Sequence, residues 1–92
     1  MKLQRFDEIL YKELQDREFA IAYLEDALSE STEEFLIALR KYVQANQGMT
    51  KCAEAASINR EALYRMLSEK GNPELDSLTA ILTACGFKLR VA

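Results

Sequence analysis

The sequence predicts a small all-α protein. Through most of its 92 residues the apolar side chains recur at three- and four-residue steps, which is the period of a helix. Only one Pro and three Gly interrupt the chain, and a hydrophobic content of 49% is enough to form a core. We therefore expect a single helical bundle rather than a disordered chain.

Two helices are predicted in an N-terminal helical extension, residues 1–30. The first covers about residues 8–14 and the second about residues 17–29. Asp7 and Asp16 are their expected N-caps, because each is followed within two residues by a Glu whose charge favours the positive end of the helix dipole.

The second helix has an apolar stripe with two possible uses. It can pack on the helices that follow, or it can form a partner-binding face. Its members are Phe19, Ala20, Tyr23, Leu24, Ala27 and Leu28.

A third helix is predicted to begin at a capping box. Ser31 is followed three residues later by Glu34, a spacing at which the two residues cap the first turn together. This helix ends at Gly48. Its apolar residues are Phe35, Leu36, Leu39, Tyr42 and Val43.

Residues 49–68 are predicted to form two short helices separated by a tight turn, which is the pattern of a helix-turn-helix. Thr50 and Asn59 are the expected caps of these helices. Ala53 and Ala56 are small enough to let the helices pack closely. The remaining apolar positions are Cys52, Ile58, Leu63, Met66 and Leu67.

The outward face of the second short helix carries polar residues, several with long side chains, which suits the major groove of DNA. Residues 31–92 are therefore predicted to form a helix-turn-helix DNA-binding domain. The residues of that outward face are Arg60, Glu61, Tyr64, Arg65 and Ser68.

Glycines mark three predicted helix ends. Gly48, Gly71 and Gly86 each stand just past one, where a left-handed conformation costs glycine least. Pro73 precedes a last helix, about residues 75–85. The apolar face of that helix is formed by Leu78, Ile81, Leu82 and Cys85.

The C-terminal segment FKLRVA alternates apolar and basic residues, which predicts a short strand. A single strand in a helical chain needs backbone partners from elsewhere. It can pair across a homodimer or with another protein. Alternatively, the segment is a frayed tail with Phe87 tucked under the last helix.

Charge is distributed unevenly along the chain. Residues 1–48 contain six basic and ten acidic residues, a net charge of −4, whereas residues 49–92 contain six basic and five acidic residues, a net charge of +1. The acidic first half is suited to a basic protein partner. Because an acidic protein has no general affinity for nucleic acid, DNA binding would depend on a local patch. The cations available for it are Lys51, Arg60, Arg65 and Lys70.

The sequence contains no pattern typical of catalysis or metal binding. It has no His, and two Cys alone make a poor metal site, so we expect neither an enzyme nor a cofactor. Cys52 and Cys85 are expected to be buried, reduced thiols. The longest apolar run, FAIAYL, is too short to span a membrane, and the N-terminus has no apolar signal core, so we expect a cytoplasmic protein.

Residues 31–89 resemble the lambda-repressor-like, XRE-type helix-turn-helix domain. More specifically, SINREALYRMLSEKGNPELDSLTAILTACGFKL, together with the upstream AIAYLEDAL and GMTKCAE, resembles the HigA-type addiction-module antidote proteins over nearly the whole chain. Two positions depart from that pattern: Ser57 stands where the turn usually has Gly, and Cys52 replaces the more usual Leu.

This resemblance implies a lambda-repressor-like bundle and a type II antitoxin. Such a protein neutralises a small RelE/HigB-like ribonuclease toxin and represses its own operon, as a homodimer bound to double-stranded operator DNA. A second class of function remains open, namely a protein-interaction module with a weak DNA-binding face. A stand-alone transcriptional regulator without a toxin is a further variant.

Different roles are expected within the DNA-binding face. Arg60 is the candidate for reading a base, because a guanidinium can donate two hydrogen bonds to guanine. Arg65 is a candidate for phosphate contact, and Tyr64 fits either role. The complete candidate set is Thr50, Lys51, Asn59, Arg60, Glu61, Tyr64, Arg65, Ser68 and Lys70.

Overall fold

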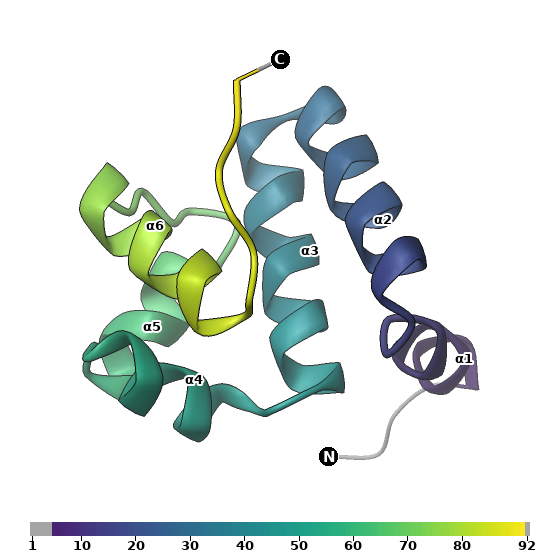
Figure 1. Ribbon diagram of the computed structural model, residues 1–92, viewed down its shortest axis with the longest axis horizontal. Coiled ribbons are helices and arrows are strands. Elements are labelled where there is room, and N and C mark those ends of the chain that lie inside the picture. Colours follow the sequence, from purple (N-terminus) through teal and green to yellow (C-terminus); the bar gives the residue numbers. More distant parts are fainter. Residues whose placement is uncertain (1–4, 92) are drawn as a thin grey trace.

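The computed structural model describes residues 5–91 and consists of helices joined by short connections (Figure 1). Within this range no strand is present, so the all-α prediction is confirmed, and no helix is both long and apolar enough to cross a membrane. The helices are α1 (Arg5–Glu13), α2 (Arg17–Glu30), α3 (Thr32–Ala45), α4 (Met49–Ala56), α5 (Arg60–Met66) and α6 (Leu75–Ala84).

One of the two predicted N-terminal caps is correct. Asp16 is the N-cap of α2, and its carboxylate accepts a hydrogen bond from the backbone N–H of Glu18 (3.1 Å). Asp7 lies inside the first turn of α1, so the prediction that it caps this helix is wrong. The carboxylate of Asp7 still lies where negative charge favours the helix dipole.

α2 and α3 run side by side in opposite directions, connected through Ser31 (Figure 1). The backbone N–H of Ser31 donates to the carbonyl of Ala27 (3.1 Å) and ends α2, while its hydroxyl accepts from the N–H of Glu34 (3.0 Å) and caps α3. The predicted role of Ser31 as a cap is therefore confirmed, but the reciprocal half of the capping box is not formed, because the N–H of Ser31 donates to Ala27 rather than to the carboxylate of Glu34. One residue satisfies backbone groups of both helices, which fixes the reversal of the chain.

α3 is the central helix and contacts α1, α2 and α4. The buried side chains form one continuous core that reaches from α1 to α6, so the N-terminal extension shares its core with the remainder of the chain. Phe19 and Tyr23 are half-buried against this core, with their ring centroids 6.1 Å apart, so most of the α2 stripe is used for packing. Leu28 is the exception, because it is 51% exposed. The largest fully buried side chains are Leu14, Leu36, Leu39, Val43, Cys52, Leu63, Leu67 and Ile81.

Residues 87–91 follow α6 and pass between it and α2, along α3 (Figure 1). They form no strand in the described chain, because no neighbouring strand offers backbone partners. Phe87 anchors the start of this C-terminal tail: its N–H donates to the carbonyl of Leu82 (2.8 Å), and its ring centroid lies 4.9 Å from that of Tyr42 in α3. The aromatic side chain is therefore packed on α3, and the predicted strand is not formed within a single chain.

Two of the three predicted glycine conformations are correct. Gly48 and Gly86 have φ values of 88° and 80°, in the left-handed region. Gly71 does not have a positive φ, and it is required for a different reason: a Cβ atom at this position would collide with the backbone carbonyl of Met66. The chain therefore turns back closely over the end of α5 before it enters α6.

Candidate functional site

The predicted pair of short helices is present, with α4 and α5 separated by residues 57–59. α4 packs against both α5 and α6. The buried side chains that hold the pair together include Cys52 and Ala53 from α4 and Leu63 from α5, with Leu67 just beyond it. The apolar positions that the sequence assigned to the interior of this unit are therefore correct.

Ser57 gives the turn its shape. It has φ 56° and ψ 42°, and it is the one non-glycine residue with positive φ in residues 5–91. The next residue, Ile58, donates its N–H to the carbonyl of Ala53 (2.9 Å), which closes the end of α4. A left-handed residue with a Cβ atom costs about 1 kcal/mol or more, so the turn keeps this strain where glycine would have none.

The start of α4 differs from the prediction. Gly48 is the N-cap, and its carbonyl accepts from the N–H of Cys52 (3.1 Å). Thr50 is the second residue of the helix and is exposed, so its predicted role as a cap is wrong. The helix begins two residues earlier than predicted, at Met49, whose side chain is buried in the core. The hydroxyl of Thr50 is consequently available to a ligand.

The start of α5 agrees with the prediction. The side-chain oxygen of Asn59 accepts from the N–H of Glu61 (2.8 Å) and from that of Ala62 (3.3 Å). This double cap fixes the first turn of α5, the turn that carries Arg60. The oxygen of Asn59 is used within the protein, which leaves its amide nitrogen for any external contact.

The end of α5 requires a correction. The helix ends at Met66, so Ser68 lies beyond it rather than on its face, and Lys70 follows in the segment after the helix. The hydroxyl of Ser68 donates to the carbonyl of Arg65 (2.7 Å) and thereby satisfies one of the last backbone acceptors. Ser68 is half-buried and acts at the helix end, whereas Lys70 is exposed.

Tyr64 lies between two arginines. The guanidinium carbon of Arg60 is 5.4 Å from the ring centroid of Tyr64, and that of Arg40, in α3, is 5.0 Å from it. Both distances are within the range of cation–π attraction. The half-buried ring therefore positions Arg60 and joins it to Arg40, a cation that the sequence analysis did not include. The adjacent basic pair Arg40 and Lys41 is the signal that could have identified it.

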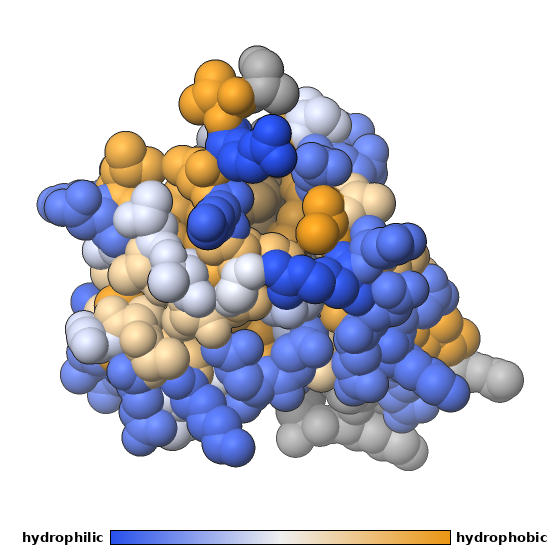
Figure 2. Space-filling model, in the orientation of Figure 1, coloured by the Kyte–Doolittle hydropathy of each residue, from blue (hydrophilic) through white to orange (hydrophobic). Residues whose placement is uncertain are grey.

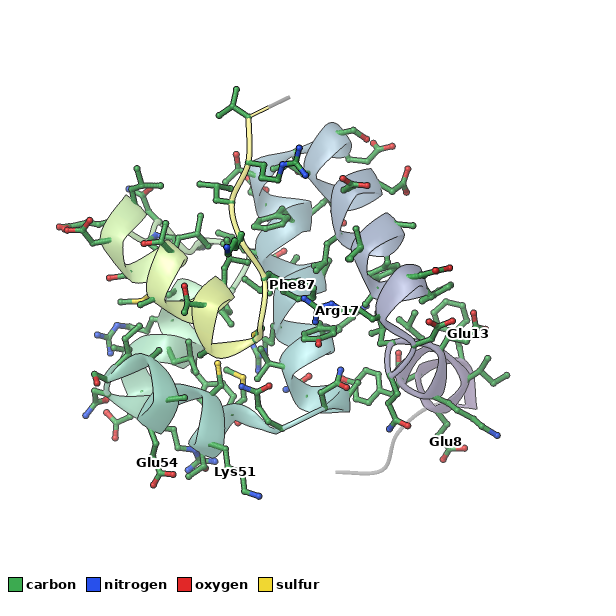
Figure 3. All side chains as sticks on the ribbon, in the orientation of Figure 1. Glu8, Glu13, Arg17, Lys51, Glu54 and Phe87 are labelled. Atoms are coloured by element: carbon green, nitrogen blue, oxygen red, sulfur yellow. The ribbon has the colours of Figure 1, made fainter. Side chains whose placement is uncertain are left out.

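A second group of cations lies at the other end of α5. Arg65 and Lys70 line the same cleft, together with Gly71, Asn72 and the residues that begin α6. Lys51 stands apart from both groups, on α4, where Figure 3 shows it pointing away from the bundle. The side chains of Lys51, Arg60, Arg65 and Lys70 are all exposed, as contact with phosphate requires.

Cys52 and Cys85 are free, buried thiols, as predicted. They join α4 to the end of α6, and the pKa of the Cys85 thiol is raised by its hydrogen bond to Cys52 and by burial. A raised pKa keeps a thiol protonated and unreactive. Residues 5–91 contain no group of three or more His, Cys, Asp or Glu side chains that could hold a metal ion.

Two comparisons with known proteins give matches. A protein family described as "Probable addiction module antidote protein" matches residues 2–92. A protein of Haemophilus influenzae (strain ATCC 51907 / DSM 11121 / KW20 / Rd), described only as uncharacterized, is 29% identical over 69 residues, which cover 75% of this chain and 71% of that protein. No solved structure matches the chain significantly.

Proposed function

This chain belongs to the probable addiction module antidote family, and on that basis we propose that it is the DNA-binding antitoxin of a type II toxin-antitoxin module. Membership of an antidote family implies a toxin partner of some kind. The proposal adds that this toxin is a small RelE/HigB-like ribonuclease and that the antitoxin represses its own operon.

The observation that carries the DNA-binding part is the exposed, preorganised start of α5. Asn59 caps this turn, and Tyr64 supports the guanidinium of Arg60, so the base-reading side chain is held before DNA arrives. Preorganisation lowers the entropy lost on binding. Arg60 would read guanine in the major groove, while Arg65, Lys51, Thr50 and Lys70 would contact phosphates.

We further propose that the chain binds DNA as a homodimer. Half-sites read by a helix-turn-helix dimer lie about 34 Å apart. A single chain measures 34 Å in its longest dimension, so two chains side by side have a suitable size to bring two α5 helices to successive major grooves. The C-terminal tail would provide the contact, because the side chains of Leu89 and Val91 are exposed on a segment that forms no strand in the described chain.

The test is a titration of the pure protein into the duplex directly upstream of its own gene, with a scrambled duplex as the control, at one salt concentration. We expect a preference for the native duplex of at least about 10³-fold, the lower end for specific binders. Equal weak binding to both duplexes would contradict the repressor part.

That second outcome would favour the alternative of a protein-interaction module. The net charge of −4 on residues 1–48 is the specific observation in favour of this alternative, since it opposes general binding to a polyanion. In that case the function would depend on the toxin partner alone.

A further inference from the structure

We propose that the toxin docks on the outer face of α1 and α2, and that it does so with a cationic surface. This inference rests on the proposed function, because it names the site that receives the toxin. The N-terminal docking face is defined by Phe6, Ile9 and Glu13 of α1 and by Glu18, Ala22 and Glu25 of α2.

The first observation is the charge of this part of the molecule. Residues 6–34 contain ten acidic side chains and two basic ones, Lys12 and Arg17. The guanidinium of Arg17 is already occupied, since it donates to the carbonyl of Gly86 and lies over the ring of Phe87. Figure 3 shows Glu8 and Glu13 directed outward from α1, on the opposite side of the molecule from Glu54 of α4.

The second observation is apolar surface among these carboxylates. Phe6 is 71% exposed and Ile9 is 54% exposed, and their three-residue spacing puts them on one side of α1. Figure 2 shows a hydrophobic area at the right edge of the molecule, near α1, with hydrophilic residues beside it. Exposed apolar side chains with a polar rim are typical of a protein-binding site.

The outer stripe of α2 continues this face. Glu18, Ala22 and Glu25 follow one another at four- and three-residue steps and are all exposed, on the side opposite the buried Ala20 and Leu24. Only residues 14–16 separate α1 from α2, so Glu18, the first residue of the α2 stripe, follows closely along the chain after Glu13, the last residue of the α1 stripe. The small side chain of Ala22 leaves room for a partner between the two carboxylates.

Electrostatics decides among the possible occupants. A second copy of this chain would bring acidic groups against acidic groups about the two-fold axis, and DNA would bring phosphates against carboxylates. Like charges opposed across an interface cost several kcal/mol. A basic protein is attracted instead, and a ribonuclease must have a cationic surface in order to bind RNA. The residues of the docking face belong to α1 and α2, whereas the cations proposed to contact DNA belong to α4, to α5 and to the segment after α5.

The experiment uses the small protein encoded beside the gene for this chain as the probe, and calorimetry to measure its Kd. The test variant is Glu13→Lys/Glu25→Lys, which changes two exposed carboxylates outside the first turn of either helix. The control variant is Glu54→Lys, which reverses one exposed carboxylate on the opposite side of the molecule (Figure 3), and Glu13→Lys alone is measured beside it so that the change in net charge is the same. An unchanged thermal midpoint must first show that all three variants are folded.

We expect the test variant to bind the probe at least about tenfold more weakly than wild type, with the control variant within about twofold. A further variant, Ile9→Ser, should also weaken binding, because it removes an apolar anchor without a change in charge. Equal losses in Glu13→Lys and Glu54→Lys, or wild-type affinity in the test variant, would overturn the docking face alone. If the wild-type chain does not bind the probe, the toxin partner of the proposed function fails as well.

Discussion

The guanidinium carbon of Arg17 lies 4.6 Å from the centroid of the Phe87 ring. These residues are 70 positions apart, at the first turn of α2 and at the start of the C-terminal tail. Arg17 also donates a hydrogen bond to the carbonyl of Gly86. One side chain therefore connects the N-terminal extension to the tail.

Arg17→Ala should release the tail without unfolding the bundle. The substitution removes the cation–π contact and one hydrogen bond of an exposed side chain, which together contribute about 1 kcal/mol. Amide hydrogen exchange of residues 86–89 should accelerate, while exchange in α3 stays as in wild type. Arg90→Ala, which changes an exposed cation on the tail itself, is the matched control. Unchanged exchange at residues 86–89 would show that Arg17 does not hold the tail.

Ser57→Gly should stabilise the protein. Removing the Cβ atom relieves about 1–2 kcal/mol of left-handed strain, and the greater entropy of glycine in the unfolded chain takes back about 0.5–1 kcal/mol. We expect a net gain of about 0.5–1 kcal/mol in the free energy of unfolding, measured in urea. Ser57→Ala keeps the Cβ atom and should give no gain. A destabilised glycine variant would contradict the proposed strain.

Stability should fall at alkaline pH. Burial raises the pKa of Tyr42 above its ordinary value of 10.0, and it raises the pKa values of Tyr11 and Tyr23 in the same direction. The folded chain then keeps protons that the unfolded chain releases, so this contribution is complete below the ordinary pKa of tyrosine and is lost as the pH rises above about 10.

The measurement is the free energy of unfolding in urea at several alkaline pH values. Tyr42→Phe removes one of the titrating groups and should make the decline shallower. A free energy that is constant or rises through this range would oppose the assigned directions of the pKa shifts.

Arg60→Ala and Arg65→Ala should affect DNA binding differently. Loss of Arg60 should relax base preference and cost about 1–3 kcal/mol on the native duplex, because a bidentate contact with guanine is lost. Loss of Arg65 should weaken binding to all sequences alike and reduce the salt slope by about 1. The measurement is fluorescence anisotropy with native and scrambled duplexes over a range of salt. Equal losses on both duplexes for Arg60→Ala would contradict its assignment as a base reader.

Arg40→Ala tests the support of Tyr64. We expect a loss of about 0.5–1 kcal/mol in binding to the native duplex, because the ring that positions Arg60 loses one of its two cations. Lys41→Ala, one position along α3, is the control, and the same anisotropy assay measures both variants. The prediction fails if the two substitutions have equal effects.

The amino-acid sequence by itself determined the helices and most of their ends. Asp16, Ser31 and Asn59 cap the helices that the sequence assigned to them, and α2 has the predicted bounds to within one residue. The physical reason is the short range of these interactions. Helix periodicity and caps depend on residues within about four positions, so a short stretch of sequence contains all the residues that take part.

Tertiary structure decided the contacts between distant residues. Arg40 and Tyr64, like Arg17 and Phe87, meet only because α3 packs centrally and the tail returns along it. Burial of Met49 also placed the start of α4 before Thr50, which the sequence predicts as the cap. These contacts and this helix boundary depend on how the side chains of all six helices fill the core. Because that packing is decided by the free energy of the whole bundle, no local sequence pattern predicts it.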